Sequence, residues 1–257
     1  MSNLFDRHLA IAGAYNIRDL GGYQAEGGET QWRRILRADA LHRVDADGMA
    51  QLVAHGLRTV IDLRHLSEMA MAPNPFRDHP EVRYLALPLF DDLAPSRMAA
   101  LRGDTLGRGR GSDVLLALYC LALAERQAEI RQVLTAIAEA PEGAVLFHCT
   151  AGKDRTGIIA ALLLALAGVA TPTILEDYAL TKSAIAPILE DIIAGAVARG
   201  ADLADFMPLL ACEPATMQAM LDHLDADYDG LAAYLARIGL EPATIERLRI
   251  RLLAEAA

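Results

Sequence analysis

The residues best suited to chemistry form one short stretch, 147–157, which reads FHCTAGKDRTG. Cys149 ends an apolar run, and five residues separate it from Arg155. Ala151 and Gly152 keep bulky side chains out of this short loop, so its backbone N–H groups can turn inward at the positive end of the next helix. Such a loop would bind a tetrahedral dianion, with Arg155 donating to two of its oxygens.

The same loop would activate the cysteine, because a positive potential stabilises the nucleophilic thiolate. A nucleotide-binding loop of the form G-x-x-x-x-G-K-[ST] does not fit. Phe147 stands where its first glycine belongs, and Asp154 follows the lysine. A sulfur-transfer loop is a weaker alternative. A purely structural buried cysteine would leave Lys153, Asp154 and Arg155 in a row without a purpose.

The stretch resembles H-C-x5-R-[ST], the signature of cysteine-dependent tyrosine and dual-specificity phosphatases. HCTAGKDRTG is similar to the bacterial and fungal branch that carries GKDRTG in its loop. Further stretches match in the same order: NIRDLGG at 16–22, RADAL at 37–41, VIDLR at 60–64 with Glu68 beyond it, and 220–240. The low-molecular-weight branch is excluded, because its loop lies near the N-terminus.

This resemblance implies hydrolysis of phosphotyrosine, with phosphoserine, phosphothreonine and phosphoinositides as further candidate substrates, and with no metal and no cofactor. Cys149 is then the nucleophile that forms a cysteinyl-phosphate, and Arg155 binds the equatorial oxygens. The phosphate is expected to lie against the backbone amides of Thr150, Ala151, Gly152, Lys153, Asp154 and Arg155.

Two neighbours of the loop have two interpretations each. Thr156 could donate to the sulfur as it leaves, or it could be an ordinary residue of the first helical turn. His148 could order the loop by hydrogen bonding, or it could be a buried structural histidine.

The general acid that protonates the leaving oxygen is open among several carboxyl groups. The resemblance favours Asp154 inside the loop, whose alternative is a salt bridge to Lys153. Asp91 and Asp92 follow a predicted strand, where related phosphatases carry a mobile acid loop, and Asp92 is the better placed. Asp62 ends another predicted strand beside the site.

Several charged residues also have a structural interpretation. Asp62 could form an orienting pair with Arg64 or Arg18, and Arg64 could pair with Glu68 four residues on. Arg18 and Asp19 in NIRDLGG are expected to tie the N-terminal segment across the sheet.

Two basic features bear on substrate range. Lys153 would place a positive charge at the pocket rim for a second phosphate, or it could be a solvated lysine. Residues 93–111 hold four glycines and four arginines, which indicates a mobile loop that could act as a lid or could be a plain linker.

The composition sets broad limits. The chain has 257 residues, 53% of them hydrophobic, and a net charge of −10, which argues against nucleic acid or an anionic membrane as the main partner. The three cysteines are far apart and include no C-x-x-C, so neither a disulfide framework nor a thiolate zinc site is indicated.

Location follows from the N-terminal residues and the apolar segments. Asp6, Arg7 and His8 stand where a signal peptide would be apolar. The 13-residue apolar run at 158–170 is too short to span a bilayer. We therefore expect a cytoplasmic protein without a transmembrane segment, with leaderless secretion as the alternative.

The elements around the loop predict an α/β fold with a central, mostly parallel sheet flanked by helices, like that of protein tyrosine phosphatases. Strands are expected over 34–38, 59–63, 82–89 and 144–149, and helices over 45–56, from 67, over 112–140 and over 156–166. From Pro172 only helices are expected, so residues 172–257 form a helical part of a single phosphatase domain that spans 1–257. Cys149 then lies at the carboxyl end of the last strand, where such sheets place their sites.

Overall fold

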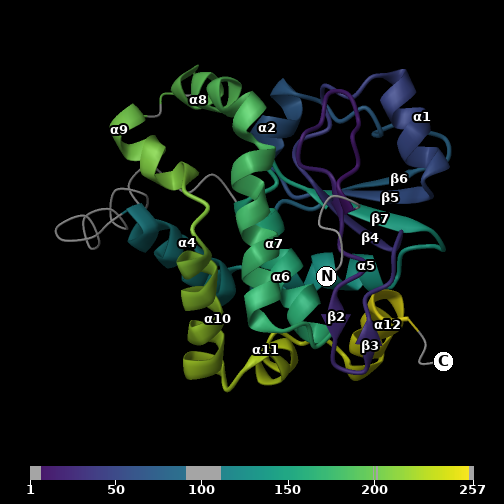
Figure 1. Ribbon diagram of the computed structural model, residues 1–257, viewed down its shortest axis with the longest axis vertical. Helices are drawn as coiled ribbons and strands as arrows, with labels where there is room; N and C mark the ends of the chain where they lie inside the picture. The colour runs from purple at the N-terminus through teal and green to yellow at the C-terminus, as the bar shows by residue number, and fades with distance from the viewer. Residues whose placement is uncertain (1–6, 91–110, 199, 201, 255–257) are drawn as a thin grey trace.

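The computed structural model describes residues 7–90, 111–198, 200 and 202–254, and it has a central five-stranded sheet with helices on both faces (Figure 1). The strands in spatial order are β1 (Arg18–Asp19), β4 (Ile35–Ala38), β7 (Ala144–His148), β5 (Leu57–Asp62) and β6 (Arg83–Ala86). The last four run parallel, and β1 is antiparallel to β4. A separate hairpin joins β2 (Gln24–Ala25) to β3 (Gly28–Glu29).

The helices form two groups in the sequence, one before and one after the loop that contains Cys149. Those before it are α1 (Ala46–Ala54), α2 (Leu66–Met71), α4 (Gly111–Glu125) and α5 (Gln127–Ala138). Those after it are α6 (Asp154–Leu166), α7 (Thr171–Ala184), α8 (Leu189–Ala198), α9 (Leu203–Phe206), α10 (Pro214–Tyr228), α11 (Leu231–Arg237) and α12 (Pro242–Leu252), with short 3-10 turns η2 (Ala186–Ile188) and η3 (Met207–Leu210). The mixed α/β fold with a mostly parallel sheet is confirmed.

The sheet separates two apolar cores, because successive side chains of a strand face opposite ways. On β7, Val145 and Phe147 face the larger core, which α4, α5, α6 and the C-terminal helices fill. Ala144 and Leu146 face a smaller core that includes Leu52 of α1. All five residues of β7 are buried, which fits a central parallel strand that reads as a continuous apolar run.

The strand register gathers the site at one edge of the sheet. Ala38 of β4 and Asp62 of β5 both lie opposite His148 of β7. The three parallel strands therefore end at the same level, and the residues that follow them converge where Cys149 leaves β7.

The predicted helix over 112–140 is two helices. The backbone leaves the helical conformation at Arg126, with φ −110° and ψ 33°. The two pieces pack on different partners, since α4 contacts α10 while α5 contacts α12, and a bend lets each reach its own neighbour. Asp91, Asp92 and all of the predicted lid 93–111 except Gly111 lie outside the described residues.

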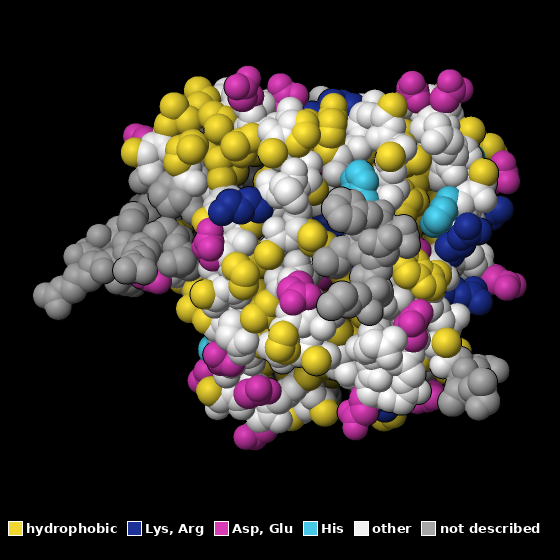
Figure 2. Space-filling view, in the orientation of Figure 1, with side chains coloured by type: hydrophobic (Ala, Val, Ile, Leu, Met, Phe, Trp, Pro, Cys, Tyr) yellow, Lys and Arg dark blue, Asp and Glu magenta, His cyan; other side chains and the backbone are white. Residues whose placement is uncertain are grey.

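Apolar side chains gather on the outer face of the α8–α9 region, at the upper left of Figure 2, and they include Val197, Leu203 and Met207. Within the described part of the chain, none of the helices combines the length and the apolar character that crossing a membrane requires.

Candidate active site

The backbone between β7 and α6 is held by its carbonyl groups. The Thr150 carbonyl accepts from the Ala40 N–H at 3.0 Å, and the Ala151 carbonyl accepts from the Asn16 amide at 2.9 Å. The same Asn16 amide reaches the Gly152 carbonyl at 3.3 Å. In a trans peptide the C=O and the next N–H point in opposite directions. The N–H groups that follow these carbonyls therefore face away from the scaffold, toward the inside of the loop.

Gly152 is required at its position. Its φ is +67°, and a Cβ there would lie 2.5 Å from the carbonyl oxygen of Ala38. Only glycine adopts this conformation without strain and lets the loop lie so close to β4.

A buried cluster of charges supports the loop from behind. Arg37 donates to the Gly152 carbonyl at 2.8 Å and also to Asp177 of α7. Arg18 donates to the same carboxylate at 2.9 Å, as does the Tyr23 hydroxyl at 2.9 Å. Burial alone would raise the pKa of Asp177, but the two guanidinium groups outweigh burial and hold that pKa well below its ordinary value.

The front of the loop carries Cys149 and Arg155. Cys149 is 2% exposed. Arg155 donates to both carboxylate oxygens of Glu68, at 2.6 and 3.1 Å, and to the Thr150 hydroxyl at 3.2 Å. Thr150 in turn donates to Glu68. Since a guanidinium has five N–H donors, this fork fixes the plane of Arg155 and still leaves donors for an anion.

The ion pair between Arg155 and Glu68 shifts both groups toward their charged forms. Burial alone would raise the pKa of Glu68, but the hydrogen bonds and charge of Arg155 lower it to about 2. Burial alone would lower the pKa of Arg155, yet the charges of Cys149 and Glu68 hold it above its ordinary value. The expected pairing of Glu68 with Arg64 is wrong, because Arg64 binds Asp62 instead.

His148 holds the start of the loop. Its Nε2 lies 2.8 Å from the Asn74 amide nitrogen, which can only donate, so Nδ1 carries the proton and donates to the Cys149 carbonyl at 2.9 Å. Burial lowers the pKa of His148, which is consistent with this neutral form. Its own carbonyl accepts from the Leu63 N–H at 2.8 Å, which links the loop to the end of β5.

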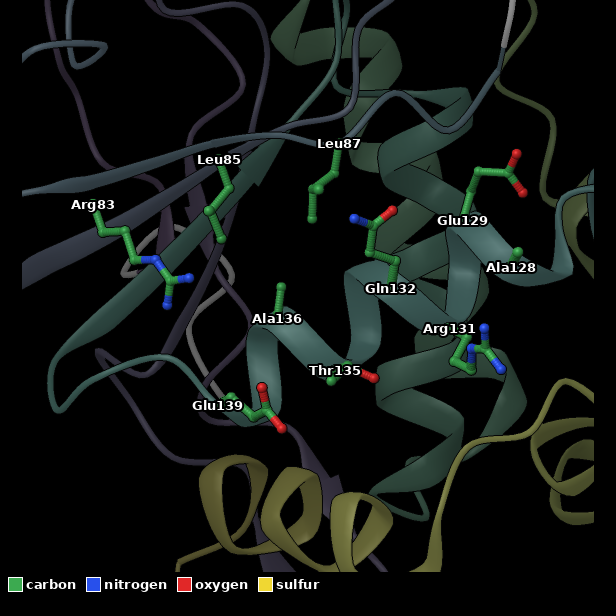
Figure 3. A pocket seen from close by; sticks show the side chains of 10 residues that line it. All are labelled: Arg83, Leu85, Leu87, Ala128, Glu129, Arg131, Gln132, Thr135, Ala136 and Glu139. Carbon is green, nitrogen blue, oxygen red and sulfur yellow. The ribbon is translucent and has the colours of Figure 1, made fainter.

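A pocket of about 180 Å³ opens beside the loop, and Thr150, Glu68, His42, Met71 and Ile192 are among its lining residues. A second cavity, of about 550 Å³, lies between β6 and α5 (Figure 3). None of the loop residues lines that second cavity, whereas Thr150 of the loop and Glu68, the partner of Arg155, both line the first pocket.

Comparison with known proteins adds an independent finding. Residues 9–254 match the family model described as "Tyrosine phosphatase family". The chain belongs to the tyrosine phosphatase family. A tyrosine-protein phosphatase of Nostoc commune is 34% identical over 226 residues, which cover 85% of this chain and 73% of that protein. The triple specificity protein phosphatase PtpB of Mycobacterium tuberculosis is 27% identical over an alignment of 273 positions, which covers 93% of this chain and 96% of that protein.

The carboxyl groups considered as general acid in this phosphatase differ sharply in environment. Asp62 is completely buried, and it accepts from Arg64 at 2.7 Å and from the Tyr84 hydroxyl at 3.1 Å. Burial would raise its pKa, but the charge and hydrogen bonds of Arg64 outweigh burial and lower it to about 2. Asp62 therefore has no proton to donate near neutral pH. It forms the orienting pair with Arg64 that was its structural interpretation.

Asp154 is the first residue of α6, and its side chain is 35% exposed. The Tyr119 hydroxyl donates to its Oδ1 at 2.6 Å, and the ammonium nitrogen of Lys153 lies 3.3 Å from the same oxygen. Among the described carboxyl groups considered as acid, it is the one inside the loop with a partly exposed side chain.

Lys153 does not lie at the rim of the pocket. Its side chain is 3% exposed, and its ammonium donates to the carbonyls of Leu209 and Ala211, the second at 3.0 Å. The end of η3 and the residue after it thus supply the carbonyl oxygens that bind the charge.

The Thr156 hydroxyl is buried and has no hydrogen-bond partner among the described residues. A buried hydroxyl without a partner is costly, and the Thr59 and Thr216 hydroxyls share this state, so the state alone assigns no role to Thr156. No group of three or more His, Cys, Asp and Glu side chains in the described part of the phosphatase is arranged to hold a metal ion.

Sequence reasoning missed several supporting residues. Asn16 and Arg37 stand in two of the stretches that carry the resemblance, 16–22 and 37–41, so a signal for them existed. Asp177 and Tyr119 lie in ordinary helical sequence, where nothing in the pattern marks a polar residue as buried.

Proposed function

We propose that the loop binds the phosphate of phosphotyrosine and that Cys149 displaces the phenolic oxygen from phosphorus. The observation that carries this assignment is the outward anchoring of three consecutive loop carbonyls, at Thr150, Ala151 and Gly152, beside a buried cysteine and Arg155. That anchoring aims N–H groups at a bound anion before any substrate arrives, so little reorganisation opposes the reaction.

The reaction then proceeds in two steps. In the first, the thiolate of Cys149 forms an S–P bond while the P–O bond to tyrosine breaks, and Asp154 gives its proton to the departing oxygen. In the second, water attacks phosphorus and the S–P bond breaks. Asp154 takes the proton from that water, and the thiolate is restored with phosphate as product. The unpartnered Thr156 hydroxyl is the proposed donor to the departing sulfur.

Arg155 and the backbone N–H groups of Thr150, Ala151, Gly152, Lys153, Asp154 and Arg155 hold the equatorial oxygens in both steps. Glu68 keeps the guanidinium of Arg155 in its plane. His148 acts on the loop through its bond to the Cys149 carbonyl and touches no substrate.

The choice of Asp154 as the general acid is tested with substrates that differ in leaving group. We expect Asp154→Asn to lose about 10²–10³-fold in kcat on phenyl phosphate, a poor leaving group, and far less on p-nitrophenyl phosphate. Asp92→Asn is measured in parallel, because Asp92 lies outside the described residues. Asp154 would be rejected as the general acid if Asp154→Asn lost kcat equally on both substrates while Asp92→Asn lost far more on phenyl phosphate than on p-nitrophenyl phosphate.

The substrate range is proposed to centre on phosphotyrosine in proteins. Although the M. tuberculosis relative is described as a triple specificity phosphatase, Lys153 gives no support here for a second phosphate, because carbonyl oxygens already surround its ammonium. We expect phosphotyrosine peptides to be hydrolysed faster than phosphoserine peptides or phosphoinositides, as measured by phosphate release. Faster release from a phosphoinositide would contradict the proposal.

We propose that residues 1–257 act as one phosphatase domain in the cytoplasm. The family match over 9–254 supports the single domain. The three free cysteines support a reducing compartment, where the nucleophile stays a thiol or thiolate.

A further inference from the structure

Two tyrosine hydroxyls from separate helices meet beside the proposed acid. Tyr119 on α4 donates to Asp154 Oδ1 at 2.6 Å, and its oxygen lies 2.8 Å from the hydroxyl of Tyr178 on α7. The rings stand edge to face, at 87° and 6.4 Å between centroids. Tyr119 is 0% exposed and Tyr178 1% exposed, so water has little access to the two hydroxyl groups.

The number of protons available fixes the direction of the hydrogen bonds that link Tyr178, Tyr119 and Asp154. A phenol has one proton to donate, and Tyr119 gives that proton to the carboxylate. Tyr178 must therefore donate to the oxygen of Tyr119. Burial and the charge of Asp154 raise the pKa of Tyr119 well above its ordinary value, so Tyr119 remains the donor in this chain at every pH at which the enzyme works.

The two oxygens of Asp154 are consequently unequal. Oδ1 receives the hydrogen bond from Tyr119 and lies 3.3 Å from the ammonium of Lys153. An oxygen that already faces two donors is a poor place for a proton, since an O–H there would oppose both of them. Oδ2 has neither of these partners.

We propose that Tyr119, supported by Tyr178, is a positioning residue that keeps the catalytic proton of Asp154 on Oδ2. This inference rests on the proposed role of Asp154 as general acid and adds the residue that directs it. Asp154 would otherwise rotate about its side-chain bonds and present either oxygen. With Oδ1 held by α4, the oxygen that carries the proton has one orientation relative to Cys149, and the carboxyl group is ready for transfer in each turnover.

The chain offers a close control. Tyr234 is also completely buried, and its hydroxyl donates to the Leu123 carbonyl of α4 at 3.0 Å. Tyr234→Phe therefore removes a buried tyrosine hydroxyl that is bonded to the same helix as Tyr119, without touching Asp154.

The test measures kcat for Tyr119→Phe, Tyr178→Phe, Tyr234→Phe and Asp154→Asn on phenyl phosphate and p-nitrophenyl phosphate from pH 4.5 to 8. We expect kcat of Tyr119→Phe to fall about 10-fold on phenyl phosphate and about 2-fold on p-nitrophenyl phosphate. The larger loss corresponds to the free energy of one hydrogen bond, and it appears in the step that needs the acid. Loss of a donor to the carboxylate favours the protonated acid. The alkaline limb of its kcat profile should therefore move to higher pH.

Tyr178→Phe should show the same changes at smaller size, and Tyr234→Phe should show neither. Thermal unfolding of each variant identifies any that does not fold. If Tyr119→Phe does not fold, Tyr178→Phe is used in its place to test the positioning role. Equal losses on both substrates with an unmoved alkaline limb would overturn the positioning role.

The same data separate this inference from the assignment beneath it. If Asp154→Asn shows no dependence on the leaving group, the general acid is elsewhere and both proposals fail. If Asp154→Asn shows the dependence while Tyr119→Phe and Tyr178→Phe behave like the wild type, only the positioning role fails.

Discussion

The two halves of the catalytic loop are held by different parts of the chain. Residues 149–152 are fixed by backbone and side-chain bonds from Asn16, Arg37, Ala40 and His148, all on or next to strands of the sheet. Residues 153–154 are held by helical segments instead. The carbonyls of Leu209 and Ala211 bind Lys153, and Tyr119 of α4 binds Asp154.

This difference separates two tasks. The half held by the sheet presents the nucleophile and the anion cradle, by which we mean the backbone N–H groups that face a bound phosphate. Hydrolysis of any phosphomonoester requires both. The half held by helices orients the proposed proton donor, whose demands change with the leaving group. Asp177 and Tyr178 connect the two halves, because they are neighbours on α7, and one anchors the cradle while the other supports the bond from Tyr119 to the acid.

The largest expected effect comes from the half held by the sheet. Cys149→Ser should lower kcat by roughly 10⁴–10⁶-fold, as loss of the nucleophile does in other hydrolases. The cradle does not depend on the sulfur, so the variant should still bind a phosphotyrosine peptide, as measured by calorimetry. Cys120→Ser, at a half-buried cysteine of α4, should keep wild-type kcat. Turnover by Cys149→Ser within 10²-fold of the wild type would remove the cysteine from the mechanism.

The next-largest effect is expected from a substitution that breaks the connection between the two halves. Asp177→Asn leaves Arg18 and Arg37 buried without a counter-charge, which should lower the free energy of unfolding by about 3–5 kcal/mol. Urea denaturation measures this loss. The matched control is Asp191→Asn, because Asp191 is 71% exposed and lies 3.7 Å from Arg43. Such a surface pair contributes less than about 1 kcal/mol, and similar losses for the two variants would show that the buried cluster has no special weight.

The sequence predicts the half held by the sheet better than the other half. The run of Cys149, Gly152 and Arg155 is local, and its spacing alone indicates an anion cradle at the end of a strand. The α/β fold follows from apolar runs of strand length alternating with helical periodicity, and the structure bears it out.

The half held by helices depends on contacts that no local pattern records. Lys153 is 56 residues from Leu209, and Asp154 is 35 residues from Tyr119. The sequence around Lys153, a loop that contains glycine, suggests a solvated lysine. In the structure the carbonyls at the end of η3 and just after it bind the ammonium and bury it. For the same reason the spacing of four residues suggests Arg64 as the partner of Glu68, whereas the fold brings Glu68 to Arg155 across 87 residues.

The smallest expected effect concerns pH, and it tests how firmly Glu68 holds the front of the loop. The pKa of Glu68 falls from 4.5 to about 2 on folding, so its contribution to stability is complete above pH 4.5 and is lost as pH falls through about 2. Glu68→Gln should therefore be less stable than the wild type by about 2 kcal/mol at pH 7, and the difference should shrink between pH 4.5 and 2. Glu213→Gln, at an exposed pair with Lys182, should differ little from the wild type at any pH. Because Glu68 stays ionised throughout pH 5–7, the acid limb of the kcat profile should keep its midpoint in Glu68→Gln. A moved midpoint would mean that Glu68 exchanges protons during turnover and does more than orient Arg155.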